Sequence, residues 1–89
     1  MQETKVLLVE DDRLIVENLT EFLKTEGFEV QCADGQEKAM ELLEGQEFDL
    51  ILLDITLAQG NGYSACTQIK SRYEIPIIFL TALDDEFPW

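Results

Sequence analysis

The stretch Leu50–Thr56, with the sequence LILLDIT, decides the fold. Its four consecutive apolar residues are too few for a helix that buries itself, and they are typical of a strand covered on both faces, as in a parallel sheet. Asp54 follows them at the carboxyl end of that strand. Ligands bind at this end of open α/β sheets, and a carboxylate there must be solvated, paired or metal-bound. Asp54 is therefore either a candidate site residue or a strand cap that starts the turn toward Gly60–Gly62.

Further strands and helices are indicated on both sides of this stretch. Short apolar runs predict three more strands, at Lys5–Val9, Phe28–Cys32 and Ile77–Leu80. Amphipathic spacing predicts three helices, from Leu14 to a stop at Gly27, from near Gln36 to a stop at Gly45, and from Tyr63 to Arg72. Strand and helix alternate, which predicts an α/β fold with a parallel sheet, right-handed crossovers and helices on both faces.

Two of these elements have informative patterns. In the first helix, Ile15, Leu19, Phe22 and Leu23 recur at three- and four-residue intervals with polar residues between them, as in an amphipathic helix. The polar alternation of Phe28–Cys32 indicates an edge strand with one face less covered.

Composition limits the classes of function. The chain has 89 residues, 46% of them hydrophobic, which suits a single folded domain. Nineteen acidic residues against six basic ones, a net charge of -13, would repel a polyphosphate backbone, so direct nucleic-acid binding by this segment is not expected. No apolar run approaches the roughly 20 residues that a membrane span needs. Together with the polar start Met1–Lys5, this points to the cytoplasm. Cys32 and Cys66 form no zinc motif and are expected to be buried and reduced.

Acidic residues end the first strand as well as the central one. If these strands are neighbours, Glu10, Asp11 and Asp54 converge at the carboxyl edge of the sheet. Two carboxylates about 4 Å apart repel by about 4 kcal/mol at an effective dielectric of about 20, so three of them need a proton or a cation. Mg²⁺ suits such oxygen-only ligands and leaves positions for phosphate oxygens. The chain has no histidine, which disfavours zinc and excludes histidine-based triads.

Thr81 closes the last predicted strand at the same edge. Its hydroxyl is placed to donate to an oxyanion bound at Asp54. A purely structural role is the alternative, because threonine is also a good strand and turn residue.

These motifs together resemble the receiver domain of two-component response regulators, most closely the subfamily with a winged-helix (OmpR/PhoB-like) transcription effector. The resemblance covers nearly the whole chain and is carried by Val9–Asp12, Leu50–Asp54 with Gly62 eight positions later, and Ile77–Ala82. It implies a flavodoxin-like (CheY-like) doubly wound parallel sheet with strand order 2-1-3-4.

The resemblance also implies a role for each candidate residue. Asp54 would be the phosphoacceptor, taking a phosphoryl group from a phosphohistidine of a sensor histidine kinase. Asp11 would hold Mg²⁺ directly, Glu10 through water, and Asp54 and the backbone carbonyl of Thr56 would complete the ligands. Thr81 would bind the phosphoryl group and act as a switch. The expected output is control of transcription, and the chain would not itself be an enzyme.

Two departures from the family pattern bear on these expectations. Ala58 stands where the family usually has proline. The family's fifth strand, terminal lysine and last helices would follow Ala82, so we expect residues 1–89 to be a receiver domain truncated after its fourth strand. The strand ending at Leu80 would then be an open edge, through which the chains would self-associate or swap elements.

Two other functions stay open. A phosphatase of the haloacid-dehalogenase kind also uses an aspartate nucleophile and Mg²⁺, but its motif has a second acid two residues later, where this chain has Thr56. An interaction fragment that is never phosphorylated would act by pairing with an intact receiver or a kinase. Multiple turnover of a phosphate ester would support the first alternative, and metal-insensitive partner binding would support the second.

Overall fold

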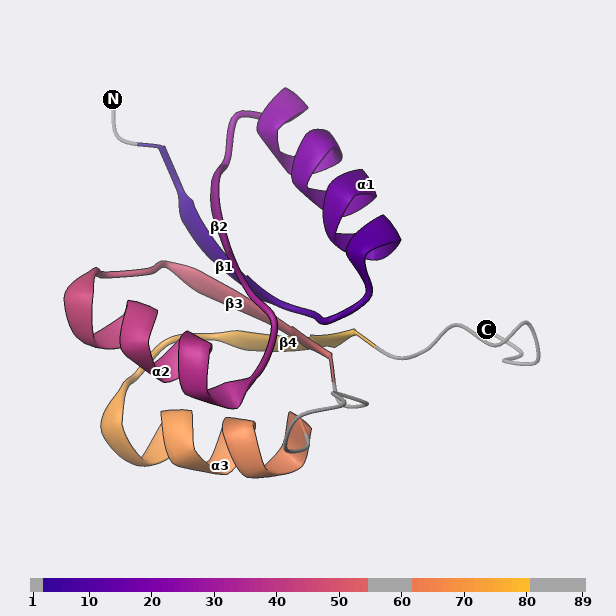
Figure 1. Cartoon of the computed structure of the whole chain (residues 1–89). Helices are drawn as coiled ribbons and strands as arrows, with labels where there is room; N and C mark the ends of the chain where they lie inside the picture. Colours follow the sequence, from indigo (N-terminus) through magenta and orange to yellow (C-terminus); the bar gives the residue numbers. More distant parts are fainter. Residues whose placement is uncertain (1–2, 55–61, 81–89) are drawn as a thin grey trace, which may run out of the picture.

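The computed structural model describes residues 3–54 and 62–80, and for Gly62 and Tyr63 the backbone alone. Strands and helices alternate through this part of the chain (Figure 1). Their bounds are β1 Lys5–Val9, α1 Arg13–Thr25, β2 Glu29–Ala33, α2 Gln36–Gly45, β3 Leu50–Asp54, α3 Gly62–Arg72 and β4 Ile77–Leu80. The predicted elements are all present with ends that differ by one residue at most.

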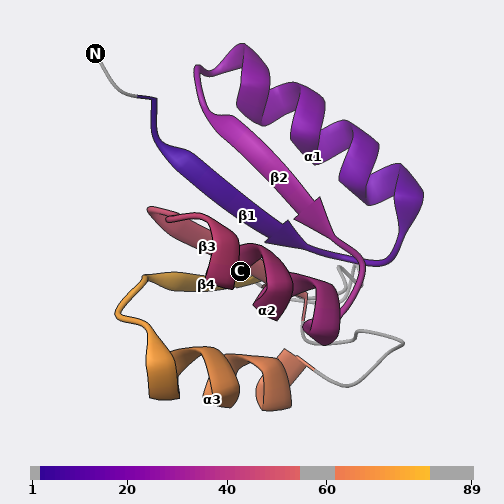
Figure 2. The same cartoon turned by 60° about the vertical axis from the view of Figure 1, so that its left-hand side comes forward.

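The strands form one parallel sheet in the order β2-β1-β3-β4. Helix α1 covers one face, and α2 and α3 cover the other (Figures 1 and 2). This arrangement confirms the predicted α/β fold, the strand order and the flavodoxin-like topology, and it confirms β2 as an edge strand among the described residues.

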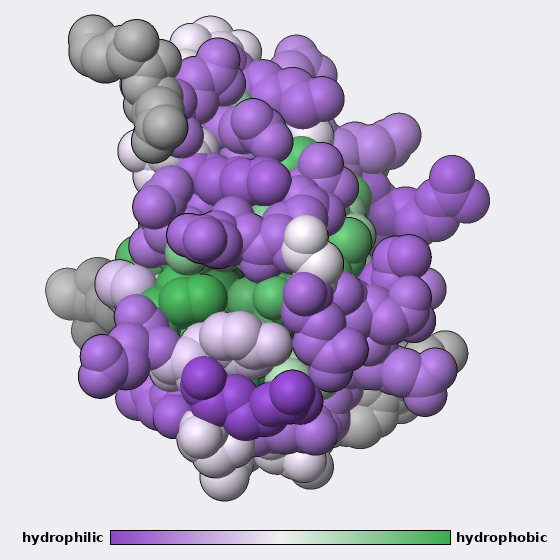
Figure 3. Space-filling model, turned by 90° about the vertical axis from the view of Figure 1, so that its left-hand side faces the viewer, coloured by the Kyte–Doolittle hydropathy of each residue, from purple (hydrophilic) through white to green (hydrophobic). Residues whose placement is uncertain are grey.

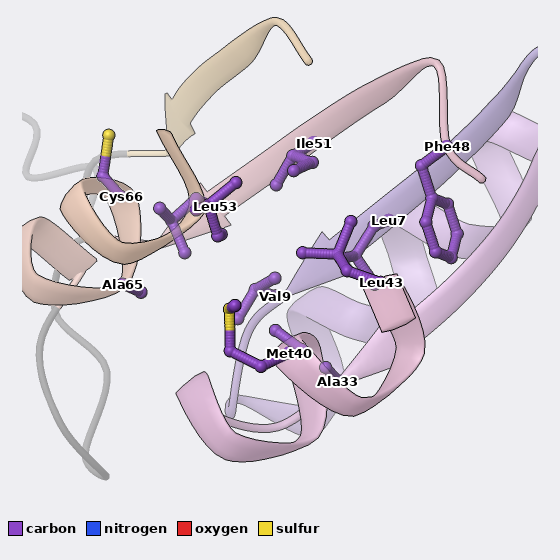
Figure 4. Packing of buried hydrophobic residues seen from close by; sticks show 12 residues of the cluster. Leu7, Val9, Ala33, Met40, Leu43, Phe48, Ile51, Leu53, Ala65 and Cys66 are labelled. Atoms are coloured by element: carbon purple, nitrogen blue, oxygen red, sulfur yellow. The ribbon is translucent and has the colours of Figure 1, made fainter. Parts of the chain in front are cut away.

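The two central strands are buried on both faces, as their continuous apolar sequences predict. Leu7, Val9, Ile51 and Leu53 point toward α2 and α3 and supply the strand side of the larger core cluster, where Met40 and Leu43 of α2 meet them (Figure 4). The alternate residues Val6, Leu8 and Leu52 form the smaller cluster beneath α1. This rigid pair of strands carries the acidic residues described below.

Helix α1 is amphipathic, as predicted, and buries part of its apolar side. Val16, Leu19 and Leu23 pack against the smaller core cluster, whereas Ile15 and Phe22 are 40% and 59% exposed. The two exposed residues lie about a quarter turn around the helix from the packed stripe. The spacing therefore predicts the helix, and its packing on the sheet decides which apolar residues are buried.

The cysteines are both free thiols, but only Cys66 is buried. Cys32 is exposed, contrary to prediction, because it lies on edge strand β2 beside a groove that α1 leaves open. Its Sγ is 3.4 Å from Thr20 Oγ1 of that helix.

Polar side chains dominate the surface. Figure 3 shows a mostly hydrophilic face with a narrow band of apolar surface across its middle. Within the described ranges, the helices are too short or too polar to cross a membrane.

Candidate functional site

The site lies where β1 and β3 end side by side. Val9 is the register partner of Leu53. Glu10, which follows β1, and Asp54, the last residue of β3, therefore come to the same level of the sheet. The backbone N–H of Glu10 donates to the carbonyl oxygen of Ala33 at 2.9 Å, which holds the start of the following loop against β2. The acid positions are therefore set by the rigid centre of the sheet.

Three carboxylates converge at this edge: one oxygen each of Glu10, Asp11 and Asp54 lies within 4.8 Å of the other two. Glu10 and Asp54 are only 4% and 5% exposed, and Asp11 is more accessible. We call this group the acidic cluster. The structure thus brings together the three acids that the sequence proposed as a group.

The surroundings of Glu10 in the acidic cluster raise its pKa. Burial is the main cause that raises the pKa of Glu10 to about 7, and the nearby Asp54 and Asp11 raise it further. The backbone N–H of Asp12, which donates to Glu10 Oε2 at 3.0 Å, acts in the opposite direction. In the absence of a cation, the protonated and ionised forms of Glu10 therefore compete near neutral pH.

Asp12 has a different role from its two acidic neighbours. Its Oδ1 accepts hydrogen bonds from the backbone N–H groups of Leu14 at 3.0 Å and Ile15 at 3.4 Å, so it is the N-cap of α1. The run Glu10–Asp12 therefore divides into two residues of the acidic cluster and one helix cap.

The donor set of the acidic cluster suits a hard divalent cation. It consists of carboxylate oxygens alone, and a cation would offset both the burial of the Glu10 carboxylate and its repulsion by Asp54 and Asp11, which together raise its pKa. Thr56, Ala58 and Thr81, which the sequence analysis also considered, lie outside the described residues.

The sequence analysis missed two basic residues near the acidic cluster. Arg13 and Lys38 line a cavity of about 640 Å³ together with Glu10 and Asp11. Their positions in the sequence could have indicated them, because each lies in the first turn of a predicted helix, where a positive charge is unfavourable.

A parallel sheet of this order, with acids gathered at the carboxyl edge of its central strands, defines the class of protein: a flavodoxin-like domain with carboxylates where ligands bind in such folds. The sequence model of the response regulator receiver domain matches residues 6–88. The chain belongs to the family of response regulator receiver domains.

Similar solved structures agree with this assignment. The non-phosphorylated HemR receiver domain from Leptospira biflexa is 36% identical, with 90% of this chain and 65% of that chain covered and a TM-score of 0.81. The N-terminal domain of a response regulator/sensory box/GGDEF three-domain protein from Carboxydothermus hydrogenoformans is 34% identical, with coverages of 96% and 68% and a TM-score of 0.86.

A third similar structure is the BeF3-activated N-terminal receiver domain of Klebsiella pneumoniae RstA. It is 29% identical, with coverages of 93% and 71% and a TM-score of 0.85. This chain spans 65–71% of the length of these three structures and 57% of a further one.

Proposed function

We propose that this receiver domain accepts a phosphoryl group on Asp54 from a phosphohistidine of a sensor histidine kinase, with Mg²⁺ bound at the acidic cluster. The observation that carries the proposal is the convergence of Glu10, Asp11 and Asp54 within 4.8 Å at the ends of neighbouring buried strands. The family assignment supports the same reaction.

The ligand roles follow the resemblance to the family. Asp11 and Asp54 would hold Mg²⁺ directly, Glu10 would hold it through water, and the carbonyl oxygen of Thr56 would complete the set. The Thr81 hydroxyl would bind the phosphoryl group. Bound Mg²⁺ supplies positive charge that neutralises the phosphoryl oxygens. The chemistry of the described donors fits this ion, because all three are carboxylates and two are buried.

The transfer itself requires mainly positioning. An Asp54 oxygen forms a bond to phosphorus while the bond from phosphorus to the imidazole nitrogen breaks, and the imidazole keeps the electron pair. β3 holds Asp54 at the buried end of a strand with Leu53 fully enclosed, so the nucleophile has little freedom to turn away.

Labelling by acetyl phosphate tests the proposal. We expect Mg²⁺-dependent incorporation of one phosphoryl group per chain, abolished in Asp54→Asn and retained in Glu47→Gln, which removes an exposed carboxylate elsewhere. Phosphorylation that survives in Asp54→Asn would assign another acceptor. No labelling of the wild-type chain would refute the function.

The output of the proposed switch is control of transcription through an effector, attached or in a partner. The sequence resemblance to the winged-helix subfamily supports this step. A cytoplasmic location accompanies it, and the two free thiols agree with a reducing compartment.

The proposal includes self-association, or exchange of elements between copies, through the β4 side of the sheet. β4 is the outermost strand on this side among the described residues, and Ile78 at its middle is 52% exposed. We expect sedimentation velocity to show dimers or larger species at micromolar concentration, and Ile78→Lys to shift them toward monomer. A compact wild-type monomer under these conditions would contradict self-association.

The two alternative functions differ in their tests. The receiver family assignment favours a phosphoacceptor over a phosphatase, and we propose that the chain is not an enzyme. Several cycles of phosphate-ester hydrolysis per chain would contradict this. If the chain is an interaction fragment, the Asp54→Ala variant should bind the partner as tightly as the wild type does, and Mg²⁺ should not change the affinity of either.

A further inference from the structure

The cavity beside the acidic cluster has a mixed electrostatic character. Glu10 and Asp11 form part of its wall, and the acids Glu17 and Asp34 also line it. Arg13 and Lys38 are the basic residues among its described lining. Two of the six basic residues of a chain with net charge -13 thus lie around one cavity next to the reaction site.

The placement of these two cations brings no evident structural gain. Arg13 is the first residue of α1 and Lys38 the third of α2, so both stand near the positive end of a helix dipole. Within the described part of the chain, neither side chain makes an ion pair or hydrogen bond. Charges that oppose local preference without a compensating contact are typical of functional positions.

The other basic side chains behave differently. Lys5 pairs with Glu29 at 3.8 Å, and Arg72 pairs with Glu44 at 3.4 Å. Lys24 and Lys70 lie in the last turns of α1 and α3, where the helix dipole favours a cation. Arg13 and Lys38 are thus distinguished by their location, because each is near the start of a helix and lines the cavity, and neither has an ion pair that offsets this position within the described residues.

We propose that Arg13 and Lys38 are positioning residues that attract anionic phosphoryl donors into this cavity and toward Asp54. The inference rests on the proposed function and assigns the approach of the donor to this cavity, which reaches the acidic cluster through Glu10 and Asp11. The chemistry that two cations favour is a dianionic phosphoryl group, such as that of a small acyl phosphate. The two cations offset the repulsion that such a donor meets from the surrounding carboxylates.

The reaction of such a donor at Asp54 balances without a further reactant. An oxygen of Asp54 forms a bond to phosphorus, the bond from phosphorus to the bridging oxygen of the acyl phosphate breaks, and the carboxylate departs with the electron pair. Arg13 and Lys38 touch neither bond. They promote the approach of the donor, so they should raise the second-order rate constant of labelling that is measured at low donor concentration.

A pair of charge-matched double variants tests the inference. Arg13→Gln/Lys38→Gln and Lys24→Gln/Lys70→Gln change the net charge equally, but only the first removes charge from the cavity. With acetyl phosphate and saturating Mg²⁺, we expect the first to lower the second-order labelling rate constant about tenfold and the second by about twofold or less. Phosphoramidate, which carries less negative charge at neutral pH, should be affected less.

Further readouts separate positioning from structure. The free energy of unfolding of Arg13→Gln/Lys38→Gln should equal or slightly exceed that of the wild type, because two unfavourable helix-end charges are gone. Arg13→Lys/Lys38→Arg should retain the wild-type rate. The wild-type rate should fall with added salt more steeply than that of the Gln variant.

The outcomes for the inference and for the proposed function are distinct. Equal rates and equal salt dependence in the two double variants, with Asp54 still labelled, would overturn the inference and leave the phosphoacceptor function intact. No labelling of the wild-type chain would overturn both.

Discussion

Glu10 shows how burial changes the acid–base behaviour of a residue in a sequence motif. It follows the buried end of β1 and lies within reach of two other carboxylates, and its pKa is raised from 4.5 to about 7. A bound cation would offset the burial of the Glu10 carboxylate and its repulsion by Asp54 and Asp11, and so lower its pKa. Metal binding at this site should therefore release protons near neutral pH.

The raised pKa makes stability depend on pH in a defined direction. The folded state holds a proton on Glu10 that the unfolded state loses at about 4.5, so this contribution is complete below pH 4.5 and is lost as pH rises through about 7. The loss is on the order of 3 kcal/mol at 1.36 kcal/mol per pH unit. Urea unfolding in EDTA at pH 5 and pH 8 should show it.

Glu10→Gln provides the matched variant for this effect. It retains the shape of the side chain and cannot ionise, so its stability should change less between pH 5 and pH 8 than that of the wild type. Glu37→Gln, at an exposed position of α2, should behave as the wild type. A wild-type stability that rises over this range in EDTA would contradict the assignment.

At the scale of elements, the strands differ in what their apolar residues do. Leu53 of β3 is fully buried in the larger core cluster, whereas Ile78 of β4 is half exposed on the outer side of the sheet. Similar apolar residues in neighbouring strands therefore contribute differently to folding and to surface contacts.

Paired substitutions should reveal this difference. Leu53→Ala should lower the free energy of unfolding by about 2–5 kcal/mol, because it leaves a cavity between β3 and α3. Ile78→Ala should cost about 1 kcal/mol or less for the monomer. Chemical denaturation at low protein concentration measures both, and comparable losses would show that Ile78 is enclosed.

At the scale of the whole molecule, the net charge of -13 opposes compaction. Part of any stabilisation by Mg²⁺ will therefore be general screening, which NaCl also supplies. Binding of Mg²⁺ at the acidic cluster should raise the free energy of unfolding by a further amount, because the ion binds this site in the folded state and not in the unfolded state.

The specific increment should reach about 2.7 kcal/mol when Mg²⁺ is at 100 times its Kd. Thermal or urea unfolding in MgCl2 and in NaCl at equal ionic strength separates the two effects. Asp11→Asn should keep the NaCl response and lose most of the Mg²⁺ increment. Equal responses of the wild type to both salts would argue against a magnesium site.

The sequence by itself determined the elements, the parallel sheet and the acids at its edge. These follow from local periodicity and from continuous apolar runs such as Leu50–Leu53, which need no knowledge of distant residues. Resemblance to a known family added the strand order 2-1-3-4 and the candidate roles.

Only the tertiary structure decided how neighbouring residues of like chemistry divide between roles. Asp12 caps α1 while Glu10 and Asp11 join Asp54, and Phe22 and Cys32 are exposed while Leu23 packs inward. The cavity between Arg13 and Lys38 also exists only once α1 and α2 are placed beside β2. Burial and proximity depend on which elements pack together, and that is a property of contacts far apart in the chain.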